Sequence, residues 1–190
     1  MPIGLPRAVD TFDGLVDQQW ERFRANPVMA RVALTASEVG DFGVVWMLFA
    51  AVPALGGSPR HGRALIRMGA ALAFESLIVN QGLKRLFKRS RPDRDALESS
   101  VARNADRQAN RHAIRHPSTS SFPSGHCTSA VTAAVLLSET SPIPAPVLWA
   151  AAGVVASSRV HVRMHHASDV IGGVGVGLAV GTLIRRFVRI

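Results

Sequence analysis

The stretch VIGGVGVGLAVGTLI, residues 170–184, contains no charged side chain and places Gly173, Gly177 and Gly181 at four-residue intervals. Glycines at this spacing lie on one face of a helix, and small residues on one face let helix backbones approach closely in lipid. The stretch therefore predicts an apolar helix that packs through its glycine face.

Four further apolar runs precede it, at residues 42–59, 68–83, 127–138 and 140–158. A membrane-spanning helix needs about 20 largely apolar residues, and the runs lie at or just below that length. Burial inside a soluble all-α core is the alternative, but five such runs in 190 residues would leave few amphipathic faces for water. The expected fold is one all-α domain, 1–190, an integral membrane bundle of about five spanning helices.

Composition supports a membrane protein with basic exposed faces. The chain carries 22 Lys and Arg against 13 Asp and Glu, a formal charge of +9, and its mean hydropathy is +0.18. That hydropathy argues against intrinsic disorder and against a soluble nucleic-acid-binding protein. Because Cys127 is the only cysteine, a disulfide scaffold and a thiolate metal site are excluded.

Two polar regions flank the apolar runs. Within the N-terminal segment, 1–40, apolar residues between Val9 and Arg24 recur every three or four positions, which predicts an amphipathic helix on the membrane surface. The opening residues lack the continuous apolar core of a cleavable signal. The long loop before Phe122 repeats arginine every fourth residue, which predicts a helix side that faces anionic lipid headgroups or, as the alternative, binds substrate directly; these are Arg103, Arg107, Arg111 and Arg115.

Three polar segments border the apolar runs, and counting crossings places all three on one membrane face. They are residues 84–92 (KRLFKRSRP), 123–126 (PSGH) and 158–169 (SRVHVRMHHASD). Lys84, Arg91 and Arg159 would bring three positive charges together, and arginine's planar fork suits phosphoryl oxygens. Ser124 and Gly125 follow a proline where a helix begins, so unpaired backbone N–H groups there would favour an anion.

Two histidines complete this set. One of His126 and His165 can act as nucleophile and the other as general acid, since imidazole titrates near neutral pH. Asp169 lies four residues after His165, so on a helix both would share a face, and the carboxylate would hold one ring nitrogen protonated. These residues predict hydrolysis of a phosphate monoester or diphosphate through a phosphohistidine.

The three-part pattern resembles the type 2 phosphatidic acid phosphatase superfamily, over a motif-bearing core at 84–169. The resemblance implies a phosphatase that needs no metal and no cofactor. It also implies that His165 is the nucleophile, His126 the general acid and Asp169 the residue that orients His165. The implied phosphate-binding residues are Lys84, Arg91, Ser124, Gly125 and Arg159. Integral-membrane relatives commonly have six spanning helices, and here the amphipathic N-terminal segment takes the place of the first.

Other interpretations are weaker. His161, His165 and Asp169 could form a metal-binding face, but no Glu adjoins the first histidine and arginines lie close by. A vanadium haloperoxidase would use the same residues, yet such relatives are larger and soluble. A non-enzymatic transporter or scaffold explains the apolar runs but not the motifs. Glu75, inside the second run, either serves function or pairs with a polar neighbour in the bundle.

The expected substrate is a lipid-linked phosphate at the bilayer surface. A polyprenyl carrier such as decaprenylphosphoryl-phosphoribose or undecaprenyl diphosphate, used in cell-wall synthesis, suits a compact bacterial member of the family. The alternatives are phosphatidylglycerophosphate and phosphatidic acid, because no residue identifies the lipid or the sugar. Lys and Arg are more numerous on the motif face than on the opposite face, even when the three expected phosphate ligands are left out of the count. This asymmetry predicts that the site of a multi-pass cell-membrane protein lies on the cytoplasmic side.

Overall fold

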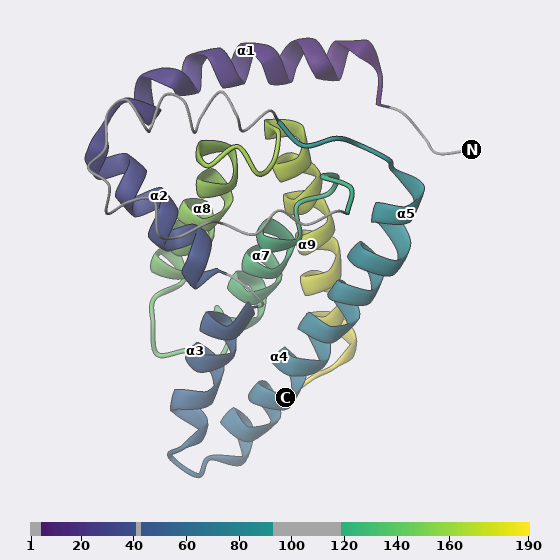
Figure 1. The fold of residues 1–190 in the computed structure, drawn as a ribbon. Coiled ribbons are helices and arrows are strands. Elements are labelled where there is room, and N and C mark those ends of the chain that lie inside the picture. Colours follow the sequence, from purple (N-terminus) through teal and green to yellow (C-terminus); the bar gives the residue numbers. More distant parts are fainter. Residues whose placement is uncertain (1–4, 41–42, 93–118) are drawn as a thin grey trace.

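The computed structural model describes residues 5–40, 43–92 and 119–190. In those ranges the regular secondary structure is helical (Figure 1). The expected all-α class is therefore confirmed. The helices are α1 (Arg7–Arg24), α2 (Pro27–Val39), α3 (Val44–Ala54), α4 (Pro59–Ser76), α5 (Lys84–Leu86), α7 (Gly125–Leu137), α8 (Ala145–His161) and α9 (Ala167–Phe187). A π-helical turn, η2 (Leu77–Leu83), joins α4 to α5.

Helix α7 is the centre of the bundle. Ten of its 13 residues are buried, and it packs against α9, α8, α4 and α3. A helix that is apolar around its whole circumference must be enclosed by other helices, and small residues such as Ala130, Ala133 and Ala134 allow that enclosure. The position of α7 therefore fixes the positions of the helices around it.

The glycine face of α9 lies directly on the backbone of α7, as the repeat predicts. A Cβ atom placed on Gly173 would lie 2.7 Å from the carbonyl oxygen of Ser124, and one on Gly177 would lie 2.7 Å from that of Thr128. Both distances are shorter than van der Waals contact. Only glycine permits this separation of the two helices.

The expectation of five spanning helices is not established by the structure. Among the described residues, α9 is the one helix long and apolar enough to cross a bilayer by itself. Helices α2 and α3, bent by 68°, pass the same test as a pair. The other runs form helices that are short, as in α7 and α8, or that include several arginines, as in α4.

The outer surface of the bundle is nevertheless apolar. Large hydrophobic side chains are exposed along four helices, and they include Leu48 and Val52 of α3, Ile66 and Phe74 of α4, Val147 and Val154 of α8, and Ile171 and Leu183 of α9. Exposed apolar surface distributed in this way marks contact with another apolar phase. Lipid around the bundle would provide that contact.

Helix α1 lies across one end of the bundle, above α8 and α9 (Figure 1). Its exposed apolar side chains are Phe12, Leu15 and Phe23. Its buried residue is an acid, Asp13, which faces the bundle. The N-terminal amphipathic helix is thus present, and the rest of segment 1–40 forms α2, which packs against α8.

Replacing Gly177 by alanine should destabilise the protein, because the new Cβ would meet a backbone oxygen that cannot move without separating α7 from α9. Overpacking of this kind typically costs about 1–3 kcal/mol. Gly175→Ala is the matched control, since nothing lies within 4 Å of its added Cβ. Thermal unfolding in detergent should show a lower midpoint for Gly177→Ala alone, and equal midpoints for the two variants would contradict this packing.

Candidate active site

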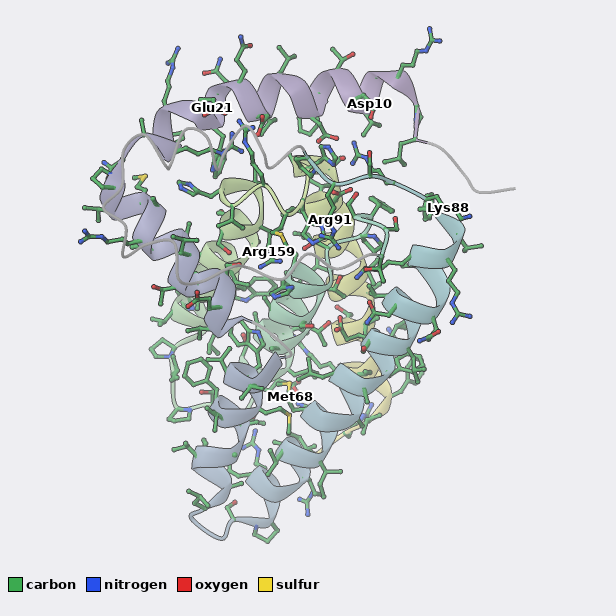
Figure 2. All side chains as sticks on the ribbon, in the orientation of Figure 1. Asp10, Glu21, Met68, Lys88, Arg91 and Arg159 are labelled. Atoms are coloured by element: carbon green, nitrogen blue, oxygen red, sulfur yellow. The ribbon has the colours of Figure 1, made fainter. Side chains whose placement is uncertain are left out.

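The three motif segments meet at the end of the bundle that α1 covers. The backbone N–H of Ser124 donates to the carbonyl oxygen of Asp169 at 3.0 Å, which joins the second segment to the third. The guanidinium Nη1 of Arg91 lies 3.3 Å from Nε2 of His165, which joins the first segment to the third. Figure 2 places Arg91 and Arg159 in this same region below α1.

Lys84 projects from α5 toward the start of α7. Its Nζ donates to Oδ1 of Asn80 at 2.9 Å and would lie 4.0 Å from a Cβ placed on Gly125. Burial, together with the positive charges of Arg91 and Arg159, lowers the pKa of Lys84 to about 8. A lysine whose pKa is lowered by burial and by two neighbouring arginines indicates a site suited to an anion.

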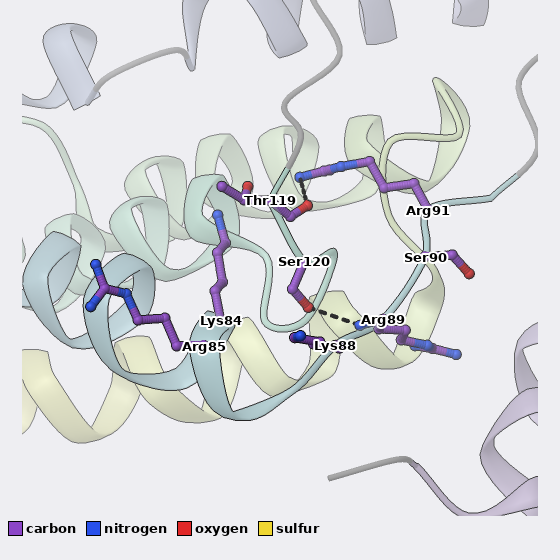
Figure 3. A pocket seen from close by; sticks show the side chains of 8 residues that line it. All are labelled: Lys84, Arg85, Lys88, Arg89, Ser90, Arg91, Thr119 and Ser120. Atoms are coloured by element: carbon purple, nitrogen blue, oxygen red, sulfur yellow. Dashed lines mark hydrogen bonds between the residues drawn. The ribbon is translucent and has the colours of Figure 1, made fainter. Parts of the chain in front are cut away.

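A cavity of about 670 Å³ opens beside Lys84 and Arg91 (Figure 3). Its lining contains five basic residues, namely Lys84, Arg85, Lys88, Arg89 and Arg91. Ser120 contributes a hydroxyl that accepts from the backbone N–H of Arg89 at 3.1 Å. The lining belongs to the first motif segment and to residues 119–120, so the cavity lies on the side of the expected phosphate ligands.

Ser124 precedes α7 at its N-cap position, and it is completely buried. Its Oγ has no hydrogen-bond partner among the described residues. An unsatisfied buried hydroxyl costs free energy, and the first amides of α7 need acceptors as well. A phosphate oxygen at the start of α7 would satisfy both.

His165 and Asp169 do not share a helix, contrary to the expectation from their spacing. His165 lies in the turn between α8 and α9, where its backbone N–H donates to the carbonyl of Arg159 at 3.1 Å. Asp169 is in the first turn of α9, where its Oδ2 accepts from the N–H of His166 at 2.8 Å and caps the helix. The Nδ1 of His165 lies 3.7 Å from Oδ2 of Asp169, so the two face each other just beyond hydrogen-bond range.

His165 is a neutral imidazole at neutral pH. Its side chain is buried, and burial together with the charges of Arg91 and Arg159 lowers the pKa of His165 to about 3, against the opposing effect of Asp169. Because Arg91 can only donate, Nε2 of His165 faces it as an acceptor, and we infer that the ring proton is on Nδ1, toward Asp169. This tautomer leaves the Nε2 lone pair available for attack.

Helix α2 closes the side of the site formed by α7 and α8. His126, half-buried in the first turn of α7, has its Cδ2 3.5 Å from the position of a Cβ on Gly40. Arg159 is buried on α8 and donates from Nη1 to Oγ of Ser37. Each motif segment thus contributes at least one of the expected residues to this end of the bundle.

Two residues that the sequence does not single out contact the site. Arg89 donates from Nη1 to Oδ1 of Asp169 at 2.7 Å and from Nη2 to Oδ2 of Asp13 at 2.5 Å. Arg89 lies within the first motif segment, two positions before Arg91, so its place in that basic segment was a usable signal. No local pattern connects Asp13 with the motifs.

The remaining sequence expectations have separate outcomes. Glu75 accepts from Oγ of Ser129 at 2.6 Å, which supports pairing with a polar neighbour in the bundle. Among the described ranges, no group of three His, Cys, Asp or Glu side chains could hold a metal ion. The arginine repeat between Arg103 and Arg115 lies outside the described residues.

Comparison with known proteins gives concordant findings. The family model described as PAP2 superfamily matches residues 64–190. The chain is 34% identical over 158 residues to the decaprenylphosphoryl-5-phosphoribose phosphatase of Mycobacterium tuberculosis, which covers 83% of this chain and 80% of that protein. The protein of the same name from Mycolicibacterium smegmatis is 34% identical over 143 residues, covering 74% and 69%.

A solved structure shows the same fold. The transmembrane PAP2-type phosphatidylglycerolphosphate phosphatase of Bacillus subtilis superposes with a TM-score of 0.72, covering 96% of this chain and 87% of the other at 22% sequence identity. The shared fold extends beyond the residues matched by the family model and includes the N-terminal helices.

Binding of inorganic phosphate should weaken as the pH rises through about 8, because Lys84, whose pKa is lowered to about 8, then loses its charge. Lys84→Arg should keep binding at higher pH, since a guanidinium stays protonated. Titration calorimetry from pH 6.5 to about 10 measures both. Lys88→Arg, an exposed lysine of the same cavity, is the control and should keep the wild-type profile; an unchanged profile in Lys84→Arg would contradict the assignment.

Proposed function

The chain belongs to the PAP2 superfamily, and from that premise we propose that it is a membrane-embedded lipid phosphatase that acts on a polyprenyl-linked phosphate through a phosphohistidine. The observation that carries the proposal is the neutral His165, whose Nε2 lies 3.3 Å from Arg91 at the meeting point of the three motif segments. A neutral nucleophile next to fixed cations suits an anionic phosphoryl group.

The reaction proceeds in two displacements. Nε2 of His165 attacks phosphorus, a P–N bond forms as the ester P–O bond breaks, and protonated His126 gives its proton to the leaving oxygen. Water then attacks the phosphohistidine while neutral His126 takes a proton from it, and the P–N bond breaks to release inorganic phosphate. The carboxylate of Asp169 offsets the positive charge on the phosphorylated ring.

The phosphate-binding roles follow the same geometry. Lys84, Arg91 and Arg159 neutralise the phosphoryl oxygens, and the Ser124 hydroxyl with the N–H groups at Gly125 accommodates the oxyanion at the start of α7. The buried and unpartnered Oγ of Ser124 supports this role. No step requires a metal ion or a cofactor.

Two observations support a decaprenylphosphoryl-phosphoribose substrate. The mycobacterial relatives named for that reaction are 34% identical over most of this chain. Besides the proposed ligands Lys84 and Arg91, the cavity is lined by Arg85 and Lys88, more cations than one phosphate requires. A lipid-linked phosphoribose carries a second phosphate, which the additional cations would accommodate.

The membrane setting is part of the proposal. The apolar helix α9 and the exposed apolar side chains of α3, α4 and α8 support a multi-pass arrangement in the cell membrane, with the site at one surface among anionic lipids. The excess of Lys and Arg on the motif face supports a cytoplasmic site. A lipid-linked headgroup would reach the site from the bilayer surface.

A substrate panel tests the function. Detergent-purified protein with EDTA is given decaprenylphosphoryl-phosphoribose, undecaprenyl diphosphate, phosphatidylglycerophosphate and phosphatidic acid, and released phosphate is measured. We expect EDTA-resistant release, fastest from the first substrate, and none from His165→Ala, because no covalent intermediate can form. His61→Ala is the control and should retain activity, because His61 lies near the start of α4, at the opposite end of the α4–α5 segment from Lys84. Undiminished release by His165→Ala would refute the mechanism.

His126→Ala should separate the two histidine roles. Loss of the general acid should slow release from a lipid phosphate by about 100- to 10,000-fold. With p-nitrophenyl phosphate, whose leaving group needs no proton, the rate of the first displacement, which forms the phosphoenzyme, should fall far less. Rapid-quench measurement of phosphoenzyme formation with both substrates makes the comparison, and an equal loss with both substrates would count against the acid role.

A further inference from the structure

Helix α1 contacts both ends of the turn that carries His165. Arg24 donates from Nε to the carbonyl of His161 at 3.0 Å and from Nη2 to that of Val160 at 2.8 Å, at the end of α8. Asp13 accepts from the backbone N–H of Ser168 at 2.8 Å, at the start of α9. A cation at a helix C-terminus and an anion at an N-terminus both complement the helix dipole.

From the start of α9, the contacts continue to Asp169 through Arg89. The guanidinium bridges two buried carboxylates, Oδ2 of Asp13 at 2.5 Å and Oδ1 of Asp169 at 2.7 Å. Ser168 also joins this group, because its Oγ accepts from Arg89 and donates to Asp13, both at 2.6 Å. Asp13 is 4% exposed and Asp169 is fully buried, so neither charge has water as an alternative partner.

These contacts divide the two oxygens of Asp169 between different tasks. Oδ1 is held by Arg89, whereas Oδ2 caps α9 at His166 and faces Nδ1 of His165 at 3.7 Å. The orientation of the carboxylate toward His165 therefore depends on Arg89 at the opposite oxygen. The orientation of Arg89 in turn depends on Asp13. With Asp169 as its one carboxylate partner, the guanidinium could turn; Asp13 at its other nitrogen holds it in one direction.

We propose that Asp13 and Arg89 are a positioning pair that fixes the carboxylate of Asp169, and through it the ring of His165, so that α1 is a working part of the catalytic assembly. The proposal rests on the proposed function in that His165 is taken as the nucleophile. The guanidinium of Arg89 is held by Ser168, Asp169 and Asp13, so the proposal assigns neither residue of the pair to the substrate phosphate. Their loss should therefore slow attack by His165 without weakening phosphate binding.

The test compares Asp13→Asn and Arg89→Lys with Glu139→Gln. Glu139 is the matched control because it is also a carboxylate paired with arginine, but it follows the C-terminal end of α7, where its partners are Arg67 and Arg185. Misplacing a reacting group by about 1 Å can cost about 100-fold. We expect kcat to fall about 10- to 100-fold in the first two variants, with KM and the Kd for inorganic phosphate within about twofold, and all three constants to stay near wild type in Glu139→Gln.

A double-mutant cycle distinguishes positioning from support of the fold. If Arg89 acts through Asp169, adding Arg89→Lys to Asp169→Asn should cause little further loss of kcat, because the carboxylate it positions is already gone. If Arg89 only stabilises the fold, the two losses should multiply. Multiplying losses would overturn the proposal.

A second measurement is independent of turnover. Proteins labelled with ¹⁵N-histidine are compared in detergent, and the His165 ring signals are assigned by their absence in His165→Ala. Asp13→Asn and Arg89→Lys should shift the Nδ1 and Nε2 resonances, and Glu139→Gln should not. If the wild type hydrolysed no lipid phosphate, the proposed function would fail, but these shifts would still establish the positioning; unmoved resonances in all variants would overturn it.

Discussion

The backbone contact between α7 and α9 is the constraint on which the site depends. Gly173 and Gly177 bring α9 onto the backbone of α7, where added Cβ atoms would lie 2.7 Å from carbonyl oxygens. At that separation, the N–H of Ser124 reaches the carbonyl of Asp169 at 3.0 Å. The contact thus places the start of α7, with Ser124 and Gly125, against the start of α9. A wider spacing between these helices would separate the proposed oxyanion contacts from the proposed nucleophile, His165.

Accumulated positive charge gives the site its chemical character. Burial, and then the charges of Arg91 and Arg159, lower the pKa of Lys84 to about 8. Together with burial, they also keep His165 neutral. Such a cluster is unfavourable while empty and favourable around a phosphoryl group, so binding of the proposed substrate would relieve the repulsion that folding creates. The same charges that would hold the anion keep Nε2 of His165 unprotonated.

Much of the fold and of the candidate site follows from local pattern. The apolar runs predict helices because helix formation depends on residues only a few positions apart. The glycine repeat predicts which face of α9 packs closely against another helix. The expectation of five spans stays a prediction, because run length in sequence is not helix length; α7 has 13 residues and α8 has 17. The i,i+4 spacing of His165 and Asp169 also misled, because α9 begins only at Ala167.

The sequence by itself determined the types of reacting groups, their order and the all-helical class, since each depends on residues close together in the chain. The tertiary structure decided which charges meet. Arg89 and Asp13 are 76 positions apart, and Asp13 and Ser168 are 155 apart. No periodicity extends over such separations, because pairing at that range is set by how α1 lies across the ends of α8 and α9. The orientation of Asp169 toward His165 is therefore set by tertiary packing and not by any sequence motif.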